Sequence, residues 1–209
     1  FREMLLTHNS NQLFILPNTN NNVLIDDYSR QNQKIRVTHI GSVGSNHHFQ
    51  DYLKALKKLP KDRFEFWFVG MLNSDIQDMI LEEDLENIIT TGQIQHSALT
   101  EIYLNTDIGV ILYKDTCLHN RFCAPNKLYE FWSYGIPVLG DILPGLKSVF
   151  KYKEQGILID MQQPDEIVDA ITKLEAFDKD FRDENIKIFN STYRLDVYLG
   201  KINNILNIT

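Results

Sequence analysis

The stretch NRFCAPNKLYEFWSYGIPVLGD, residues 120–141, joins an irregular basic loop to a helix pattern and then to a strand pattern. Pro125 suits a first helical turn, because its φ is already helical and a backbone N–H there would have no partner. Gly135 can adopt the left-handed conformation that ends a helix. Between them, apolar residues repeat at helical spacing, at Leu128, Phe131 and Trp132. The stretch therefore predicts a helix from about Pro125 to Gly135, followed by a strand that starts at Ile136-Pro137.

The first turn of this predicted helix carries a candidate nucleotide site. Asn126, Lys127 and Glu130 share one face, because helical residues three and four apart are neighbours. Unpaired backbone N–H groups and the helix dipole favour an anion at the helix start. A carboxylate one turn deeper can accept hydrogen bonds from a diol, and a phosphate next to a diol is the outline of a nucleotide. An ordinary solvated amphipathic helix fits the same residues, so this segment alone leaves both interpretations open.

The motif PNKLYEFWSYGIPVLG, residues 125–140, resembles the donor-binding signature of GT-B glycosyltransferases of the retaining family 4 type, P-x-K-x-x-E-x-x-A-x-G-x-P-V. In that family, the Glu matched by Glu130 holds the ribose hydroxyls of a nucleotide sugar. A second Glu often stands eight residues earlier, where this chain has Phe122. The resemblance therefore implies a ribose contact at Glu130 and leaves the catalytic residue unassigned.

Composition and charge set the outer bounds of the prediction. With 209 residues, 43% of them hydrophobic, the chain can bury a sizeable core. A net charge of −7 and the lack of a basic stripe argue against a general nucleic-acid binder. The two cysteines, Cys117 and Cys123, form no disulfide framework, so a reducing cytoplasm is the expected compartment. No apolar run reaches the roughly 20 residues that span a bilayer.

Strand patterns alternate with helical patterns from Arg36 onward, which is typical of an α/β fold with a parallel sheet and helices on both faces. We expect strands at residues 36–41, 64–69, 87–91, 107–113, 137–140 and 156–160. The earlier segment LFILPN, residues 13–18, is either a first strand of this domain or, as the resemblance implies, the last strand of a preceding one.

The resemblance also divides the chain into three parts. Residues 1–35 are interpreted as a remnant of an N-terminal domain with its linker, and residues 36–177 as a Rossmann-like donor-binding domain, the C-terminal domain of a GT-B fold. Residues 178–209 are predicted to form a helical tail that packs on the missing N-terminal domain. Because the chain starts at Phe1 without a Met, we interpret it as a fragment.

Ligands of such sheets bind outside the carboxyl ends of the strands, at a topological switch point. In the loop after the first strand, Gly41, Ser42 and Gly44 would allow a phosphate or sugar to approach the backbone, although a tight turn fits equally well. The family often has an Arg and a Lys for the diphosphate in this loop. This chain has Ser42 in the place of the Arg, and His47 and His48 near that of the Lys.

Two further loops belong to the same predicted edge. Gly92-Gln93-Ile94 resembles the loop that the family uses to contact the nucleobase through backbone atoms. The segment 114–130 gathers the cations Lys114, Arg121 and Lys127, and positive charge is what a diphosphate leaving group requires. Ordinary surface charge remains the alternative for this cluster. The triplet Asp178-Lys179-Asp180 spells the D-x-D of metal-dependent glycosyltransferases, but its charged surroundings favour a solvated helix.

The sequence thus predicts a glycosyltransferase donor-binding domain, of a kind used in polysaccharide biosynthesis. The resemblance implies transfer from a nucleoside-diphosphate sugar with retention and without an obligatory metal or other cofactor. The acceptor would be a glycan or a lipid-linked molecule brought by the missing domain, with peripheral association of the full-length enzyme at the inner membrane face as an option. Two alternatives stay open: a GT-B nucleotide-sugar epimerase, and a non-catalytic nucleotide-binding or interaction module.

Overall fold

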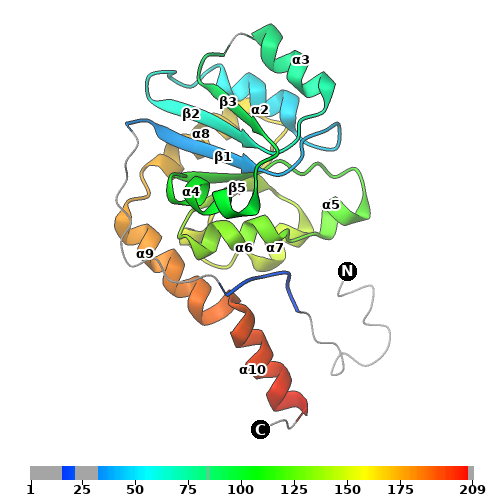
Figure 1. Ribbon diagram of the computed structural model, residues 1–209, viewed down its shortest axis with the longest axis vertical. Helices are drawn as coiled ribbons and strands as arrows, with labels where there is room; N and C mark the ends of the chain where they lie inside the picture. The colour runs from blue at the N-terminus through cyan, green and yellow to red at the C-terminus, as the bar shows by residue number, and fades with distance from the viewer. Residues whose placement is uncertain (1–15, 22–32, 84, 207–209) are drawn as a thin grey trace.

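The computed structural model describes residues 16–21, 33–83 and 85–206. Its strands form one parallel sheet in the order β3-β2-β1-β4-β5-β6 (Figure 1). The strands are β1 (Ile35–Ile40), β2 (Phe64–Val69), β3 (Ile88–Gly92), β4 (Ile108–Ile111), β5 (Val138–Asp141) and β6 (Gly156–Ile159). Every strand predicted from Arg36 onward is confirmed, with small shifts at the ends. Of the segment 13–18, residues 13–15 lie outside the described residues, and residues 16–18 are not in a strand.

Helices cover both faces of the sheet (Figure 1). On one face, α2 (Phe49–Leu56), α3 (Ser74–Glu83) and α8 (Pro164–Glu175) enclose what we call the first core. On the other face, α4 (Leu99–Leu104), α6 (Asn126–Ser133), α7 (Pro144–Val149) and α9 (Lys179–Ile188) enclose the second core. The remaining elements are α5 (Leu118–Phe122), α10 (Leu195–Leu206) and the short turns η2 (His96–Ala98), η3 (Lys153–Gln155) and η4 (Phe189–Tyr193).

Strand β4 lies at the centre of the sheet and is covered by helices on both faces. All of it is buried, as its continuous apolar sequence predicts for a strand with helices on both sides. Val110 belongs to the first core and Ile111 to the second. Gly109, next to Val110, lets α6 approach the sheet, since a Cβ there would lie 2.7 Å from the ring of Phe131. The candidate helix α6 is therefore fixed directly against the central strand.

The start of α6 differs by one residue from the prediction. Pro125 precedes the helix as its N-cap residue, with φ −69° and ψ 153°, and the helix begins at Asn126. Pro125 is extended rather than helical, and its carbonyl accepts the N–H of Leu128 at 3.0 Å. Gly135 ends the helix as expected, with φ +73°. A Cβ at this glycine would lie 2.7 Å from the carbonyl oxygen of Arg182, so α9 packs closely there.

Much of the segment 178–209 lies within the domain. Ile188, Phe189 and Tyr193 are buried members of the second core. Arg182 is also buried and donates to the carbonyls of Thr106 and Tyr134 at 3.0 and 3.3 Å. The helix α10 instead extends beyond the body of the domain (Figure 1). Packing of this segment on a second domain stays a prediction.

Within the described ranges, every helix is too short or too polar to cross a lipid bilayer.

Candidate functional site

The strand order reverses between β1 and β4, which places the switch point of the sheet at these two strands. The loop 41–48 follows β1, and the segment 112–125 leads from β4 to α6. Both begin at the carboxyl edge, where ligands of open α/β sheets bind. The start of α6 therefore lies at the edge that the sequence predicts for the nucleotide.

The carboxylate of Glu130 is the centre of the candidate site. The Nζ of Lys127 lies 2.8 Å from Oε2 of Glu130, and the two side chains are 23% and 16% exposed. The amide of Asn126 donates more weakly to Oε1, at 3.4 Å. Asn126 and Lys127 thus both contact Glu130, as their spacing on the helix predicts, and the carboxylate is partly shielded from water.

Tyr103 joins this cluster from α4, and the sequence analysis did not identify it. Its hydroxyl donates a hydrogen bond to Oε2 of Glu130. Its ring is 3% exposed, stacks on Tyr134 with centroids 4.7 Å apart, and meets Phe131 edge-on at 5.5 Å. Burial, followed by the charge of Glu130, raises the pKa of this phenol well above its ordinary value. A buried tyrosine usually requires a polar partner, and this was the only available signal for the contact.

The glycine loop after β1 is held by the neighbouring strand. The Gly41 N–H donates to Val69 at 2.9 Å, and Gly41 has φ +133°. The Gly44 N–H donates to Nδ1 of His47 at 3.2 Å. Ser42 follows Gly41 in this loop. The structure therefore gives Gly41 and Gly44 roles in a tight, internally bonded turn, and their contact with a ligand stays a prediction.

The side chains of the adjacent histidines have different neighbours. His47 faces the ring of Tyr113, with centroids 5.7 Å apart, and burial lowers its pKa. His48 is buried, and its Nε2 lies 3.0 Å from a carboxylate oxygen of Asp141 at the end of β5. His47 thus contacts the segment after β4, and His48 contacts the end of β5.

Asn120 connects the glycine loop with the cationic segment. This residue is 2% exposed, and its amide donates to the carbonyls of Asn46 and Lys114 at 3.1 and 3.0 Å. The Lys114 N–H also donates to Asn46. Lys114 is thereby fixed next to the loop of Gly41 and Gly44, with an exposed side chain. Arg121 forms a long ion pair with Asp115, at 3.5 Å.

The third predicted loop lies farther along the same edge. Gly92 ends β3 with φ +65°, and Ile94 packs against the second core. Strand β3 is separated from β1 by β2. A cavity of about 260 Å³ adjoins this loop, lined by Gly70, Leu72, Gln77, Ile80, Leu81, Thr90 and Gly92.

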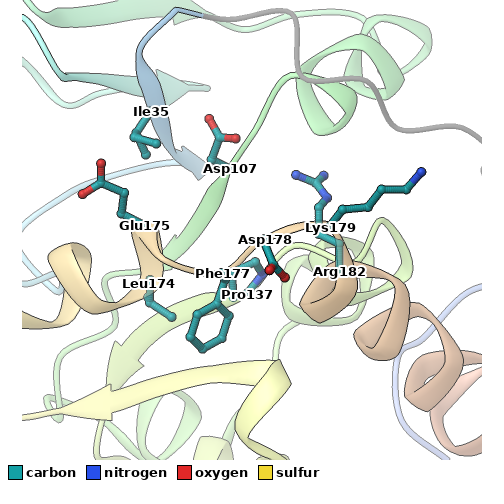
Figure 2. A pocket seen from close by; sticks show the side chains of 9 residues that line it. All are labelled: Ile35, Asp107, Pro137, Leu174, Glu175, Phe177, Asp178, Lys179 and Arg182. Atoms are coloured by element: carbon teal, nitrogen blue, oxygen red, sulfur yellow. The ribbon is translucent and has the colours of Figure 1, made fainter.

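Another cavity, of about 220 Å³, lies at the opposite edge of the sheet (Figure 2). Its lining includes Ile35, Asp107 and Pro137, which begin or precede β1, β4 and β5. It is therefore not part of the predicted nucleotide site. Asp178 also lines it, and its side chain accepts the N–H of Phe181 as the N-cap of α9. The first acid of the D-x-D triplet thus has a structural contact.

The family described as "Glycosyl transferases group 1" matches residues 34–176, and the chain belongs to this family. Its fold is that of a GT-B C-terminal domain. No curated protein matches the chain by sequence.

Solved structures of glycosyltransferases are similar in fold. The lipopolysaccharide outer core galactosyltransferase WaaB, in its apo form, has a TM-score of 0.73 at 16% identity, over 98% of this chain and 58% of that one. Alr3699/HepE from Anabaena, in complex with UDP and glucose, has a TM-score of 0.67 at 14% identity, over 84% and 49%. The C-terminal domain of LpcC from Francisella tularensis has a TM-score of 0.59 at 18% identity, over 77% and 86%. The chain spans about half the length of the HepE and WaaB chains.

Proposed function

We propose that this chain binds a nucleoside-diphosphate sugar and forms the donor side of a glycosyltransferase. The observation that carries the proposal is the carboxylate of Glu130, held beside Lys127 in the first turns of α6. The start of a helix attracts phosphate, and a carboxylate next to it can accept hydrogen bonds from both ribose hydroxyls. Membership of the group 1 family supports this role.

Donor binding would exchange the partners of an existing ion pair. In the structure, Lys127 neutralises Glu130. A bound nucleotide offers phosphate to the ammonium group and ribose hydroxyls to the carboxylate, so each group gains a new partner when it loses the old one. Lys127, the helix dipole and the nearby Lys114 would then stabilise the leaving diphosphate without an obligatory metal ion.

The acceptor side is part of the same proposal. Family resemblance supports transfer with retention to a glycan or a lipid-linked acceptor, which a second Rossmann-like domain would bring to the donor. For a lipid-linked acceptor, we expect the full-length enzyme to associate peripherally with the cytoplasmic face of a membrane.

A thermal-shift panel tests nucleotide binding directly. We expect UDP, GDP, ADP, CMP and the matching nucleotide sugars to raise the melting temperature unequally, because a ligand that binds only the native state stabilises it. UDP is the first choice, because the similar HepE was solved with UDP. No shift with any nucleotide at millimolar concentration would favour the interaction module. Conversion of the nucleotide sugar by the full-length protein without an acceptor would favour the epimerase.

Substitution of Glu130 tests the ribose contact. Glu130→Ala should weaken nucleotide binding by about 1.5 to 3 kcal/mol, the usual range for hydrogen bonds to a charged group, and calorimetry can measure this. Glu184→Ala is a matched control, because Glu184 also pairs with a lysine three residues away, on α9. Equal binding of a ribonucleotide and its 2′,3′-dideoxy analogue by the unmodified chain would show that Glu130 does not hold ribose.

A further inference from the structure

Beyond the predicted site residues, the contact between α4 and α6 assigns a role to a buried tyrosine. We propose that Tyr103 is a positioning residue for donor recognition, which fixes the carboxylate of Glu130 so that Oε1 is presented to the ribose. This inference rests on the proposed function, because it concerns how the same carboxylate is oriented.

The two oxygens of Glu130 have different surroundings. Oε2 accepts both the hydroxyl of Tyr103 and the ammonium of Lys127, whose nitrogen lies 2.8 Å away. Oε1 meets only the amide of Asn126 among the contacts of the described residues, at 3.4 Å. A carboxylate oxygen can accept about two hydrogen bonds. When Lys127 moves to phosphate, Oε2 still accepts the hydroxyl of Tyr103, whereas Oε1 keeps only the long contact with Asn126. Oε1 therefore has the greater capacity to accept a ribose hydroxyl.

Tyr103 is better suited than Lys127 to hold this orientation. Lys127 has a long side chain that is 23% exposed, and the proposed function transfers its ammonium to phosphate when the donor binds. The ring of Tyr103 is 3% exposed and is held by contacts with Tyr134 and Phe131. A phenol is protonated in the neutral pH range, and burial raises the pKa of Tyr103 further above that range. The hydroxyl can thus remain a donor to Glu130 before and after the donor binds.

A hydroxyl deletion tests this role without removing the ring. We expect Tyr103→Phe to reduce the preference for a ribonucleotide over its 2′,3′-dideoxy analogue by about tenfold, which corresponds to roughly 1.4 kcal/mol. Affinity for the dideoxy analogue should change little, because that analogue does not use Glu130. Tyr134→Phe is the matched control, since it deletes a hydroxyl from the stacked neighbouring ring and should leave the preference unchanged.

A double-mutant cycle separates positioning from a purely structural effect. Glu130→Gln is combined with Tyr103→Phe, and calorimetry with both nucleotides is repeated. If Tyr103 acts through the carboxylate, its hydroxyl should have little influence on ribose preference once Glu130 is replaced. Equal loss of affinity for both nucleotides in Tyr103→Phe, or an unchanged ribose preference, would overturn the inference and leave the proposed function intact. Failure of the unmodified chain to bind any nucleotide would overturn both.

Discussion

At the scale of single residues, Lys127 allows phosphate recognition to be separated from ribose recognition. Lys127→Ala should lower the affinity for a nucleoside diphosphate about tenfold, or roughly 1.4 kcal/mol, because a charge-assisted contact with phosphate is lost. The bare nucleoside should be affected less. Calorimetry with both ligands measures the difference, with Lys187→Ala as control, because Lys187 also pairs with a glutamate three residues away. Equal weakening of nucleoside and diphosphate would contradict the phosphate assignment.

His39 leads to a second prediction at this scale, on stability. It is 5% exposed, its Nδ1 lies 3.1 Å from the carbonyl of Val110, and burial lowers its pKa from 6.5 to about 4. The unfolded chain therefore takes up the proton first as the pH falls. The free energy of unfolding has its full value above about pH 6.5 and falls between pH 6.5 and about pH 4, where the unfolded chain is protonated at His39 and the folded chain is not. At about 1.4 kcal/mol per pH unit, the loss approaches roughly 3 kcal/mol.

Urea unfolding at pH 7 and pH 4.5 can measure this contribution. Replacing the histidine in His39→Gln should remove about 2 to 3 kcal/mol of the acid destabilisation. His96→Gln replaces an exposed histidine and should keep the full pH dependence of the unmodified chain. If His39→Gln retains the same pH dependence as His96→Gln, then protonation of His39 does not oppose folding.

At the scale of elements, α9 fixes the C-terminal end of the candidate helix. Arg182 donates to the carbonyl of Tyr134, which follows α6, and to that of Thr106, which precedes β4. Arg182→Ala should lower the free energy of unfolding by about 2 to 3 kcal/mol, because buried carbonyl groups lose their partners. Lys187→Ala removes an exposed cation from the same helix and should change the free energy of unfolding far less. Chemical denaturation that gave equal effects would contradict this role.

The sequence predicted elements better than the contacts between them. The continuous apolar run of β4 and the glycine at 135 determine structure locally, so the strand and the end of α6 were predictable. The core role of α9 was not, because Arg182 and Asn185 are buried polar residues in a segment whose charged composition indicates a solvated helix. The contact of Tyr103 with Glu130 depends on how two helices pack, which helical periodicity alone does not define.

The same distinction applies to the candidate site. Spacing within one helix was sufficient to bring Asn126, Lys127 and Glu130 together, because residues three and four apart are neighbours whatever surrounds the helix. The clamp that Asn120 forms between two loops depends on a tertiary fold. Its amide reaches Asn46 across 74 positions of sequence, and no local pattern specifies such a contact.

At the scale of the whole molecule, donor binding and sugar transfer should be separable. Catalysis requires both reactants to be held in one geometry. This positioning can lower the activation barrier by about 7 kcal/mol or more. The chain spans about half the length of the similar HepE and WaaB chains. In this structure, α10 extends beyond the body of the domain, and its packing on a second domain stays a prediction (Figure 1).

We therefore expect the 209-residue chain to bind a nucleotide sugar and to transfer no sugar to added glycan or lipid-linked acceptors. Calorimetry establishes donor binding, and chromatography of the products measures transfer under the same conditions. A longer form of the protein that includes an acceptor-binding domain serves as the positive control and should transfer. Robust transfer by the 209-residue chain alone would show that these residues also position the acceptor, and the proposed division between donor and acceptor domains would then be wrong.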